Sequence, residues 1–248
     1  GRRRLASAVA ALALSAGIQA FPPRALAAAA SPPTPPAAVL SLYHPGVSSY
    51  YGFLETPVVV RSQPEPTAPA VQRLGISTAD GTSMLVEVIA QSTGPDGSWV
   101  QVHMPVLPDS RTGWLPRSDL SGLIAVHTWL IVDTERLRAT LIDNGRTIFT
   151  APIGVGKAST PTPHGSFYVI DRLTNLEEGG FYGPLAFGTS AKSGVLTDWP
   201  GGGVVGIHGT DEPQLIPGRP SHGCIRMRNQ DILRLGRLMP VGTPVTIK

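Results

Sequence analysis

The sequence has little cysteine and little charge. Its 248 residues include a single cysteine, Cys224, and 15% are charged. One cysteine cannot form an intramolecular disulfide, so a disulfide-stapled scaffold is excluded. Outside the cytoplasm a lone thiol is prone to oxidation, so it is expected to be either buried and inert or chemically active. The residues around Cys224 must decide between these two.

An apolar run near the amino terminus is too short to span a membrane. It extends from Leu5 to about Phe21, follows Arg2, Arg3 and Arg4, and leads to the small-x-small sequence Ala25-Leu26-Ala27. Crossing the hydrocarbon takes about 20 apolar residues. This order predicts a secretory signal peptide over residues 1–27. The expected location is therefore the cell envelope, in the cell wall or the periplasm, with a membrane contact only through an uncleaved leader.

The excess of positive charge belongs to the leader. Cleavage after Ala27 would leave 16 of the 20 Lys and Arg residues against 17 Asp and Glu residues. The pI of about 9.3 is therefore mostly a property of the leader. A remainder this close to neutral lacks the basic footprint of nucleic-acid binding, so no nucleic-acid partner is expected.

Glycine and proline are abundant, at 28 and 25 residues, and they favour short strands joined by turns. The fold class predicted is mainly β. Residues 28–55 begin with Ala- and Pro-rich sequence and are predicted to be a linker. Residues 56–121 are predicted to form a small β-barrel. The strands expected there lie near 58–60, 83–90, 98–102 and 113–115.

Three segments within residues 56–121 resemble those of a bacterial SH3-like domain. They are VRSQPEP, WVQV and GWLPRSDL, in that order. The resemblance implies a domain of the kind that commonly binds cell-wall peptides. Trp99 and Trp114 are expected to pack in the core or at the rim of the barrel.

Residues 124–248 are predicted to form a second, mainly β domain with one helix. The helix is expected over 229–239, because Ile232, Leu235 and Leu238 recur at helical spacing before Pro240. Residues 179–209 are rich in Gly, Ser and Thr and are predicted to be a lid or a substrate-facing loop. The strands expected lie at 128–133, 138–142, 147–153, 166–171 and 244–248.

Two histidine-bearing segments point to chemistry at the cysteine. They are GIHGT, residues 206–210, and SHGCIRMRN, residues 221–229. A thiol becomes a strong nucleophile when an imidazole takes its proton, and His208 and His222 are the candidates. Gly223 leaves room for a substrate carbonyl, and the amides of Gly223 and Cys224 could face a developing oxyanion.

The pattern HGT…SHGCIRM resembles the signature of the YkuD-type L,D-transpeptidases. Further segments resemble the same family in the same order: IGVGKASTPTPHGSF, YGPLAF and NQDILRL…VGTPVTI. The resemblance covers residues 124–248, half of the chain. It implies an L,D-transpeptidase-type β-sandwich with short helices, acting on peptidoglycan stem peptides without a metal or organic cofactor.

The resemblance also implies a reaction. Cys224 would attack a donor tetrapeptide stem and release D-Ala through a thioester. An amine of a neighbouring stem would then take the acyl group, giving a cross-link between third-position residues. Carbapenem-type β-lactams would acylate the same cysteine.

Supporting roles follow from the positions that match the motif. His208 matches the general base, with the backbone carbonyl of Gly209 as its orienting partner, and His222 would help to hold the site. The amides of Gly223 and Cys224 would form the oxyanion hole. The residues implied on the substrate side are Tyr182, Ser221 and Arg226.

Several alternatives stay open at this point. Water in place of the amine would make the protein a carboxypeptidase on the same thioester. A non-catalytic wall-binding module, an inert buried thiol, and a metal site made by His208, His222 and Cys224 are weaker readings, and no CxxC, HxxxH or HExxH spacing supports the last. The histidines expected at turns or on the surface are His44, His103, His127 and His164.

Overall fold

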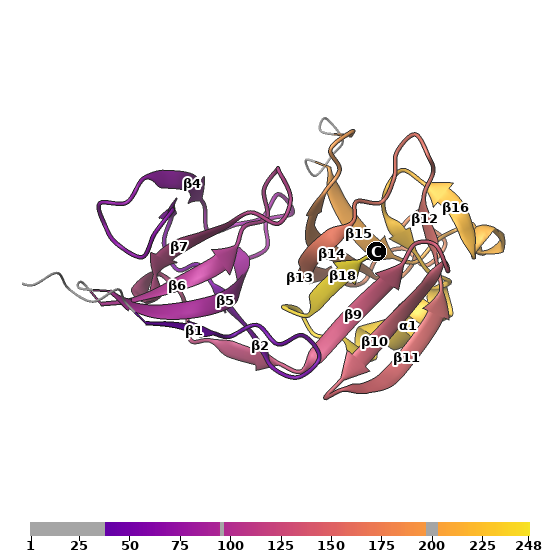
Figure 1. The fold of residues 1–248 in the computed structure, drawn as a ribbon. Helices are drawn as coiled ribbons and strands as arrows, with labels where there is room; N and C mark the ends of the chain where they lie inside the picture. The colour runs from indigo at the N-terminus through magenta and orange to yellow at the C-terminus, as the bar shows by residue number, and fades with distance from the viewer. Residues whose placement is uncertain (1–37, 95–96, 197–202) are drawn as a thin grey trace, which may run out of the picture. The chain divides into compact units, whose positions relative to one another are not determined.

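The structure, a computed structural model, describes residues 38–94, 97–196 and 203–248. The predicted signal peptide and residues 28–37 of the predicted linker lie outside the described residues. The described chain is mainly β, as predicted, and its strands form two sheets (Figure 1). The described residues also contain one α-helix and two short 3-10 turns.

The first sheet is antiparallel and has eight strands. Its order is β4-β3-β7-β6-β5-β2-β8, with β1 paired to β5. The strands predicted near 58–60, 83–90, 98–102 and 113–115 are confirmed as β3, β5, β6 and β7. The bounds are β1 Val39–Ser41, β2 Ser49–Phe53, β3 Val58–Arg61, β4 Ala70–Leu74, β5 Leu85–Gly94, β6 Gly97–His103, β7 Thr112–Pro116 and β8 Ile124–Val126.

This sheet begins earlier in the chain than the sequence indicated. Strands β1 and β2 lie inside residues 28–55, which were expected to be linker. The prolines that suggested a linker end at Pro36 except for Pro45, and Tyr50 and Tyr51 then supply residues that favour strands. The prediction of an N-terminal β region is confirmed, but this region begins two strands earlier than residue 56.

The interior of the first sheet holds both tryptophans and a histidine. Trp99 and Trp114 are buried beside Ala90, as expected for core or rim residues. His103 was expected at a turn or on the surface, and that prediction is wrong. It lies on β6 opposite Glu87 on β5, and their side chains form an ion pair in which His103 Nδ1 lies 2.6 Å from Glu87 Oε2. Cross-strand pairing places the two side chains next to each other on one face.

The second sheet is mixed and has ten strands in the order β11-β10-β9-β18-β13-β14-β15-β17-β12-β16. The strands predicted at 128–133, 138–142, 147–153, 166–171 and 244–248 are confirmed as β9, β10, β11, β13 and β18. The bounds are β9 Thr128–Asp133, β10 Arg138–Asp143, β11 Arg146–Pro152, β12 Gly154–Gly156, β13 Gly165–Leu173, β14 Ala186–Lys192, β15 Val204–His208, β16 Gly218–Ser221, β17 Ile225–Arg226 and β18 Pro244–Ile247.

The sheet curls into a half-barrel at β13. Residues 165–168 of this strand pair with β18, and residues 169–173 pair with β14. The two halves enclose one apolar core, into which α1, Asn229–Leu238, inserts Ile232 and Leu235. The predicted helix is thus confirmed. Residues 124–248 were expected to form a β-sandwich with short helices. The structure instead shows a curled mixed sheet with one short α-helix.

Two strands, β14 and β15, lie within the predicted lid over residues 179–209, near the centre of the strand order. Small residues explain why the sequence concealed them: Gly188 packs so closely against Asp171 that an added Cβ would lie 2.3 Å from its Oδ1. Two irregular described segments face the pocket, residues 174–185 before β14 and residues 193–196 after it, and residues 197–202 of the predicted lid lie outside the described residues.

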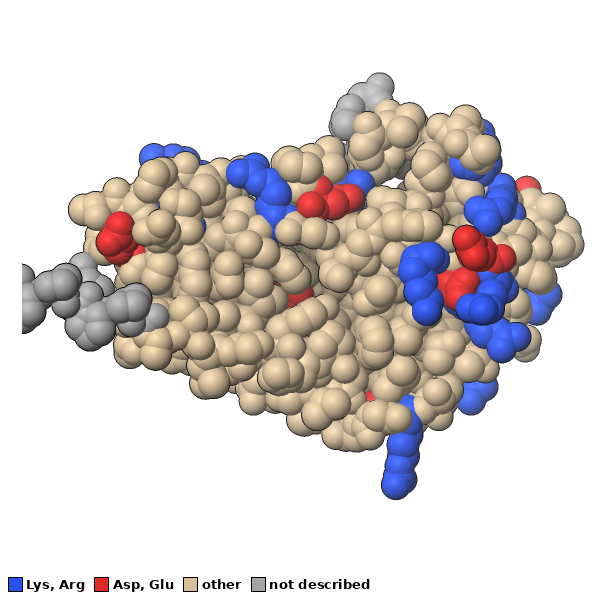
Figure 2. Space-filling view, in the orientation of Figure 1, with Lys and Arg blue, Asp and Glu red and all other residues tan. Residues whose placement is uncertain are grey.

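Tyr168 joins the two sheets. Its hydroxyl lies 3.1 Å from the carbonyl oxygen of His103, and its ring packs with Tyr51 and Leu85 of the first sheet. On the face shown in Figure 2, acidic and basic side chains lie among each other. No helix in the described residues is both long and apolar enough to cross a membrane.

Candidate active site

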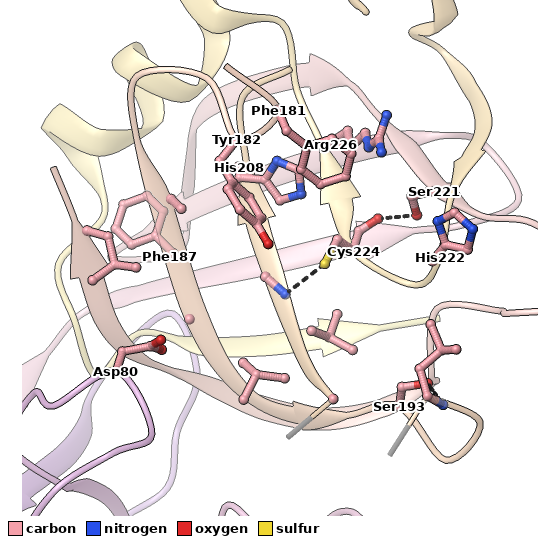
Figure 3. Close-up of a pocket in the computed structure, with 18 of the residues that line it drawn as sticks. Asp80, Phe181, Tyr182, Phe187, Ser193, His208, Ser221, His222, Cys224 and Arg226 are labelled. Carbon is pink, nitrogen blue, oxygen red and sulfur yellow. Dashed lines mark hydrogen bonds between the residues drawn. The ribbon is translucent and has the colours of Figure 1, made fainter. Parts of the chain in front are cut away.

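Cys224 lies in a pocket of about 270 Å³ on the second sheet. It follows β16, and the pocket walls come from β14, β15 and the irregular segment before β14. Figure 3 shows His208 and Arg226 on the same side of the pocket as Tyr182, with the thiol between them and His222. Apolar side chains such as Leu173, Phe187 and Val205 complete the lining.

The thiol of Cys224 is held close to a backbone amide. The N–H of Gly206 on β15 points at Sγ from 3.4 Å. Burial raises the pKa of the Cys224 thiol, and the Gly206 amide and the charge of Arg226 offset this only in part. At neutral pH the resting nucleophile is therefore a protonated thiol, which needs a base before it can attack.

His208 has the geometry of such a base. Its Nδ1 lies 2.6 Å from the carbonyl oxygen of Gly209, and because a carbonyl only accepts, Nδ1 carries the proton. The second nitrogen, Nε2, is thus unprotonated, and within the described residues it has no hydrogen-bond partner although the side chain is 1% exposed. Burial lowers the pKa of His208 to about 4, so the imidazole is neutral at physiological pH.

Two glycines let the backbone pack around His208. An added Cβ on Gly209 would lie 2.5 Å from Asn229 Oδ1, and one on Gly183 would lie 2.7 Å from the Cα of Gly209. Asn229 in turn accepts the N–H of Thr210 at 2.9 Å and donates to the carbonyl of Glu178. Glycine at 209 is therefore required by close approach, and Asn229 fixes the segments on both sides of His208.

Arg226 is buried beneath an aromatic side chain. Its Nη1 donates to Glu212 Oε2 at 2.9 Å, and its guanidinium lies 4.5 Å from the ring centroid of Phe181. Cation–π contact and the ion pair hold Phe181 beside His208, 5.9 Å between ring centroids. Arg226, expected on the substrate side, thus lines the pocket and also shapes its wall.

Tyr182 lies over His208 from the solvent side. The two rings meet edge to face with centroids 5.0 Å apart, and Tyr182 is 45% exposed. Exposed aromatic surface next to a buried imidazole is suited to cover a bound substrate. Tyr182 lines the pocket together with Cys224, and its contact with substrate stays a prediction.

Ser221 and His222 differ in their exposure. Ser221 is buried, and its hydroxyl donates to the carbonyl of Cys224 and accepts the N–H of Gly223, at 2.6 and 3.1 Å. Its hydroxyl therefore fixes the turn, although the residue was expected to contact substrate. His222 is exposed at the rim of the pocket, with its Nε2 3.1 Å from the ammonium of Lys157.

The N–H of Gly223, predicted to face an oxyanion, is already bonded to Ser221. Gly223 has a φ of +125°, a conformation that a residue with a side chain rarely adopts, so glycine is required at this turn. Among the described residues no three His, Cys, Asp or Glu side chains gather as metal ligands.

Three residues of the site escaped the sequence analysis. Phe181 precedes the family-like YGPLAF segment, Glu212 follows the HGT motif, and Thr162 lies within the TPTPHG part of the earlier segment. Their neighbours in the chain were noted, but their contacts cross 14 to 61 positions of sequence. A signal for Thr162 existed in its place inside a matched segment.

Comparison with known proteins identifies the family of the second sheet. Residues 127–247 match the model of the L,D-transpeptidase catalytic domain, YkuD. The chain is 36% identical over 146 residues to YkuD of Bacillus subtilis (strain 168), a protein named as an L,D-transpeptidase. The aligned region covers 59% of this chain and 73% of that protein. It is 29% identical over 142 residues to YbiS of Escherichia coli (strain K12), covering 48% of this chain and 44% of YbiS.

Solved structures give a similar but weaker match. The crystal structure of Enterococcus faecium L,D-transpeptidase shares 28% identity, covers 49% of each chain and superposes with a TM-score of 0.38. The assignment therefore rests on the sequence matches, of which the Bacillus subtilis one covers more than two thirds of its partner. The chain belongs to the YkuD family of L,D-transpeptidases, whose members are cell-wall enzymes.

Proposed function

We propose that this protein is a peptidoglycan L,D-transpeptidase of the cell envelope, with Cys224 as nucleophile and His208 as general base. The observation that carries the proposal is the unprotonated Nε2 of buried His208, which has no hydrogen-bond partner among the described residues and lies in the pocket that holds the single cysteine. A buried polar atom without a partner costs free energy in the resting protein. A base that accepts the thiol proton during the reaction gives that atom a use.

The first half-reaction makes a thioester. His208 Nε2 takes the proton of Cys224, and Sγ bonds to the donor carbonyl carbon while the π electron pair moves to the carbonyl oxygen. When this pair returns, the C–N bond to D-Ala breaks. The departing nitrogen takes the proton from His208, so D-Ala leaves as a neutral amine and the acyl group stays on Sγ.

The second half-reaction consumes the thioester. The amine of a neighbouring stem attacks the same carbonyl, its proton passes to His208, and the C–S bond breaks with the electron pair on sulfur. Cys224 regains the proton and a cross-link between third-position residues remains. Thiolate suits both steps because it is a good nucleophile and a good leaving group.

The surroundings of the nucleophile support acyl transfer over mere binding. Apolar walls and the Phe181–Tyr182 cover reduce water at the thioester, which favours an amine over hydrolysis. Tyr182 and Arg226 are the residues we expect to contact the stem. Hydrolysis of the same thioester, a carboxypeptidase activity, is the second candidate, since water can attack the same carbonyl in place of the acceptor amine.

The rest of the chain fits an exported enzyme. The first sheet, which we interpret as an SH3-like domain, would position the wall relative to the pocket. Residues 1–27 would direct export, and carbapenem-type β-lactams would form an adduct on Cys224. No metal ion or organic cofactor enters these steps.

Product analysis tests the proposal. The protein without residues 1–27 is incubated with a tetrapeptide stem, and products are identified by mass spectrometry beside Cys224→Ala. We expect a cross-linked dimer with loss of D-Ala from the wild type and no product from the variant. Tripeptide alone would establish the carboxypeptidase, and equal wall retention by both proteins without any product would favour a binding module.

A further inference from the structure

Three of the four backbone polar groups of Gly223 and Cys224 are hydrogen-bonded to side-chain hydroxyls. Ser221 Oγ accepts the N–H of Gly223 and donates to the C=O of Cys224. The C=O of Gly223 accepts a hydrogen bond of 2.8 Å from the hydroxyl of Thr162. Within the described residues, the N–H of Cys224 has no hydrogen-bond partner. An unpaired amide beside a nucleophile is a ready oxyanion donor.

The hydroxyl of Thr162 can only be the donor in its hydrogen bond to the carbonyl of Gly223. The N–H of Gly156 on β12 donates to Thr162 Oγ1 at 2.9 Å, so the hydroxyl accepts there. Its single proton is then directed to the Gly223 carbonyl. The side chain is 5% exposed, so water does not compete for either bond.

The irregular segment that holds Thr162 packs closely against β12. An added Cβ on Gly156 would lie 2.3 Å from the carbonyl oxygen of Thr160 and 2.6 Å from the nitrogen of Thr162. The next residue, Lys157, donates its N–H to the carbonyl of Ser221 at 3.0 Å. Thr162 therefore belongs to a rigid floor beneath the nucleophile turn.

We infer that Thr162 is a positioning residue that aims the Cys224 N–H at the oxyanion. The Gly223–Cys224 peptide bond is trans, so its C=O and N–H point in opposite directions. Pulling the carbonyl toward Thr162 turns the amide away from the floor and toward the pocket side. This rests on the proposed function, because it needs an acyl group on Cys224.

The amide acts while the S–C bond forms. As Sγ adds to the carbonyl carbon, the π pair moves to the oxygen, and the Cys224 N–H donates to that charge. Gly223 N–H, bonded to Ser221, is not the donor in this arrangement. Removing one such donor typically costs about 10²- to 10³-fold in rate, and misaiming it costs less.

Two reactions at the same sulfur separate this role from folding and from thiol reactivity. Acylation by p-nitrophenyl acetate passes through an oxyanion, whereas alkylation by iodoacetamide does not. Both are followed by intact mass at Cys224 for the wild type, Thr162→Val and Thr162→Ser, with Cys224→Ala as background. The ratio of acylation to alkylation is the readout.

The Val variant should lose about 10- to 100-fold in this ratio and the Ser variant should stay within about threefold of wild type. With the stem peptide, kcat should fall while KM is retained. An unchanged ratio in folded Thr162→Val would overturn the inference. A wild type that acylates from the ester but never turns over stem peptide would instead count against the proposed function alone.

A wild-type measurement covers the case in which Thr162→Val does not fold. A peptide aldehyde adds to Cys224 as a thiohemiacetal, and the ¹⁵N-labelled protein reports which amide binds the new oxygen. The Cys224 amide proton should move downfield and that of Gly223 should not. A shift confined to Gly223 would refute the inference.

Discussion

The two sheets each place a histidine in the interior, and the two differ in what faces the ring. On the first sheet His103 meets the carboxylate of Glu87, 2.6 Å away, with side-chain exposures of 14% and 0%. On the second sheet His208 meets a backbone carbonyl and lies near the positive charge of Arg226. An imidazolium at position 103 would lie in direct contact with an opposite charge, whereas at position 208 the nearby charges of Arg226 and Asp211 act on the pKa in opposite directions.

The difference shows how one residue type serves two purposes. A carboxylate partner ties His103 into the fold, and breaking a buried pair leaves an uncompensated charge. A carbonyl partner fixes the orientation of His208 and leaves Nε2 without a proton and, in the part of the chain that the structure describes, without a hydrogen-bond partner. Burial of a histidine thus predicts neither role by itself, and its hydrogen-bond partner decides.

Removal of the His208 ring should have the largest effect. In His208→Ala the rate of Cys224 acylation by the stem peptide should fall by about 10²- to 10⁴-fold, because the thiol loses its base. Stopped reactions analysed by intact mass give the rate, and circular dichroism checks the fold. His44→Ala, which removes an exposed ring, is the control. A near-wild-type rate in folded His208→Ala would remove His208 from the base role.

The opposite outcome is expected for His103→Ala. Glu87 would remain buried without its partner, and the free energy of unfolding should fall by about 3 kcal/mol or more. The acylation rate of the remaining folded protein should stay close to wild type, because His103 does not line the pocket. Urea unfolding and single-turnover kinetics measure the two. A loss of acylation rate as large as that in His208→Ala would contradict a purely structural role for His103.

The pH profile sharpens the assignment of His208. With its pKa lowered to about 4, acylation should be level from pH 5 to 7 and fall below, by tenfold per pH unit once His208 is protonated. Stability should also fall between about pH 6.5 and 4, because the unfolded chain takes up a proton that folded His208 resists. A rate that already declines at pH 6.5 would show a histidine without the depressed pKa.

A smaller effect is expected from Glu87→Gln. Burial raises the pKa of Glu87, although His103 opposes this, so the carboxyl loses its proton at a higher pH in the folded protein than in the unfolded chain. Stability from this group is then present at low pH and lost as pH rises above the unfolded value of about 4.3. Glutamine does not titrate, so the stability of the variant relative to the wild type should rise between pH 4.5 and 8. Thermal unfolding of both proteins at pH 4.5 and pH 8 measures the difference in their stability. A difference that is the same at the two pH values would contradict the prediction.

Much of the fold was readable because its signals are local. Short runs rich in apolar and β-branched residues marked β9, β10 and β13, and helical spacing marked α1. Strands β14 and β15 were missed because Gly, Ser and Thr mask alternation, and their strand nature depends on neighbours that pack onto them. Strands β1 and β2 were missed because proline-rich sequence runs up to them.

The site divides in the same way. Cys224, His208 and His222 were found because they lie within 17 positions of each other and match a motif. Glu87 and His103 became a pair only through the register of β5 and β6. Thr162 reaches Gly223 across 61 positions, a contact that composition and spacing do not contain.

Trapping the acyl-enzyme is a direct test of Cys224 as the nucleophile and of His208 as its base. The wild type is mixed with excess tetrapeptide stem in the absence of an acceptor, quenched in acid within seconds, and analysed by intact mass and peptide mapping. We expect the mass of the protein to increase by that of the tripeptide acyl group, located on Cys224, with one D-Ala released per adduct. The yield of this adduct should be much lower in His208→Ala. Release of D-Ala without any adduct on Cys224, or an adduct on another residue, would contradict Cys224 as the nucleophile.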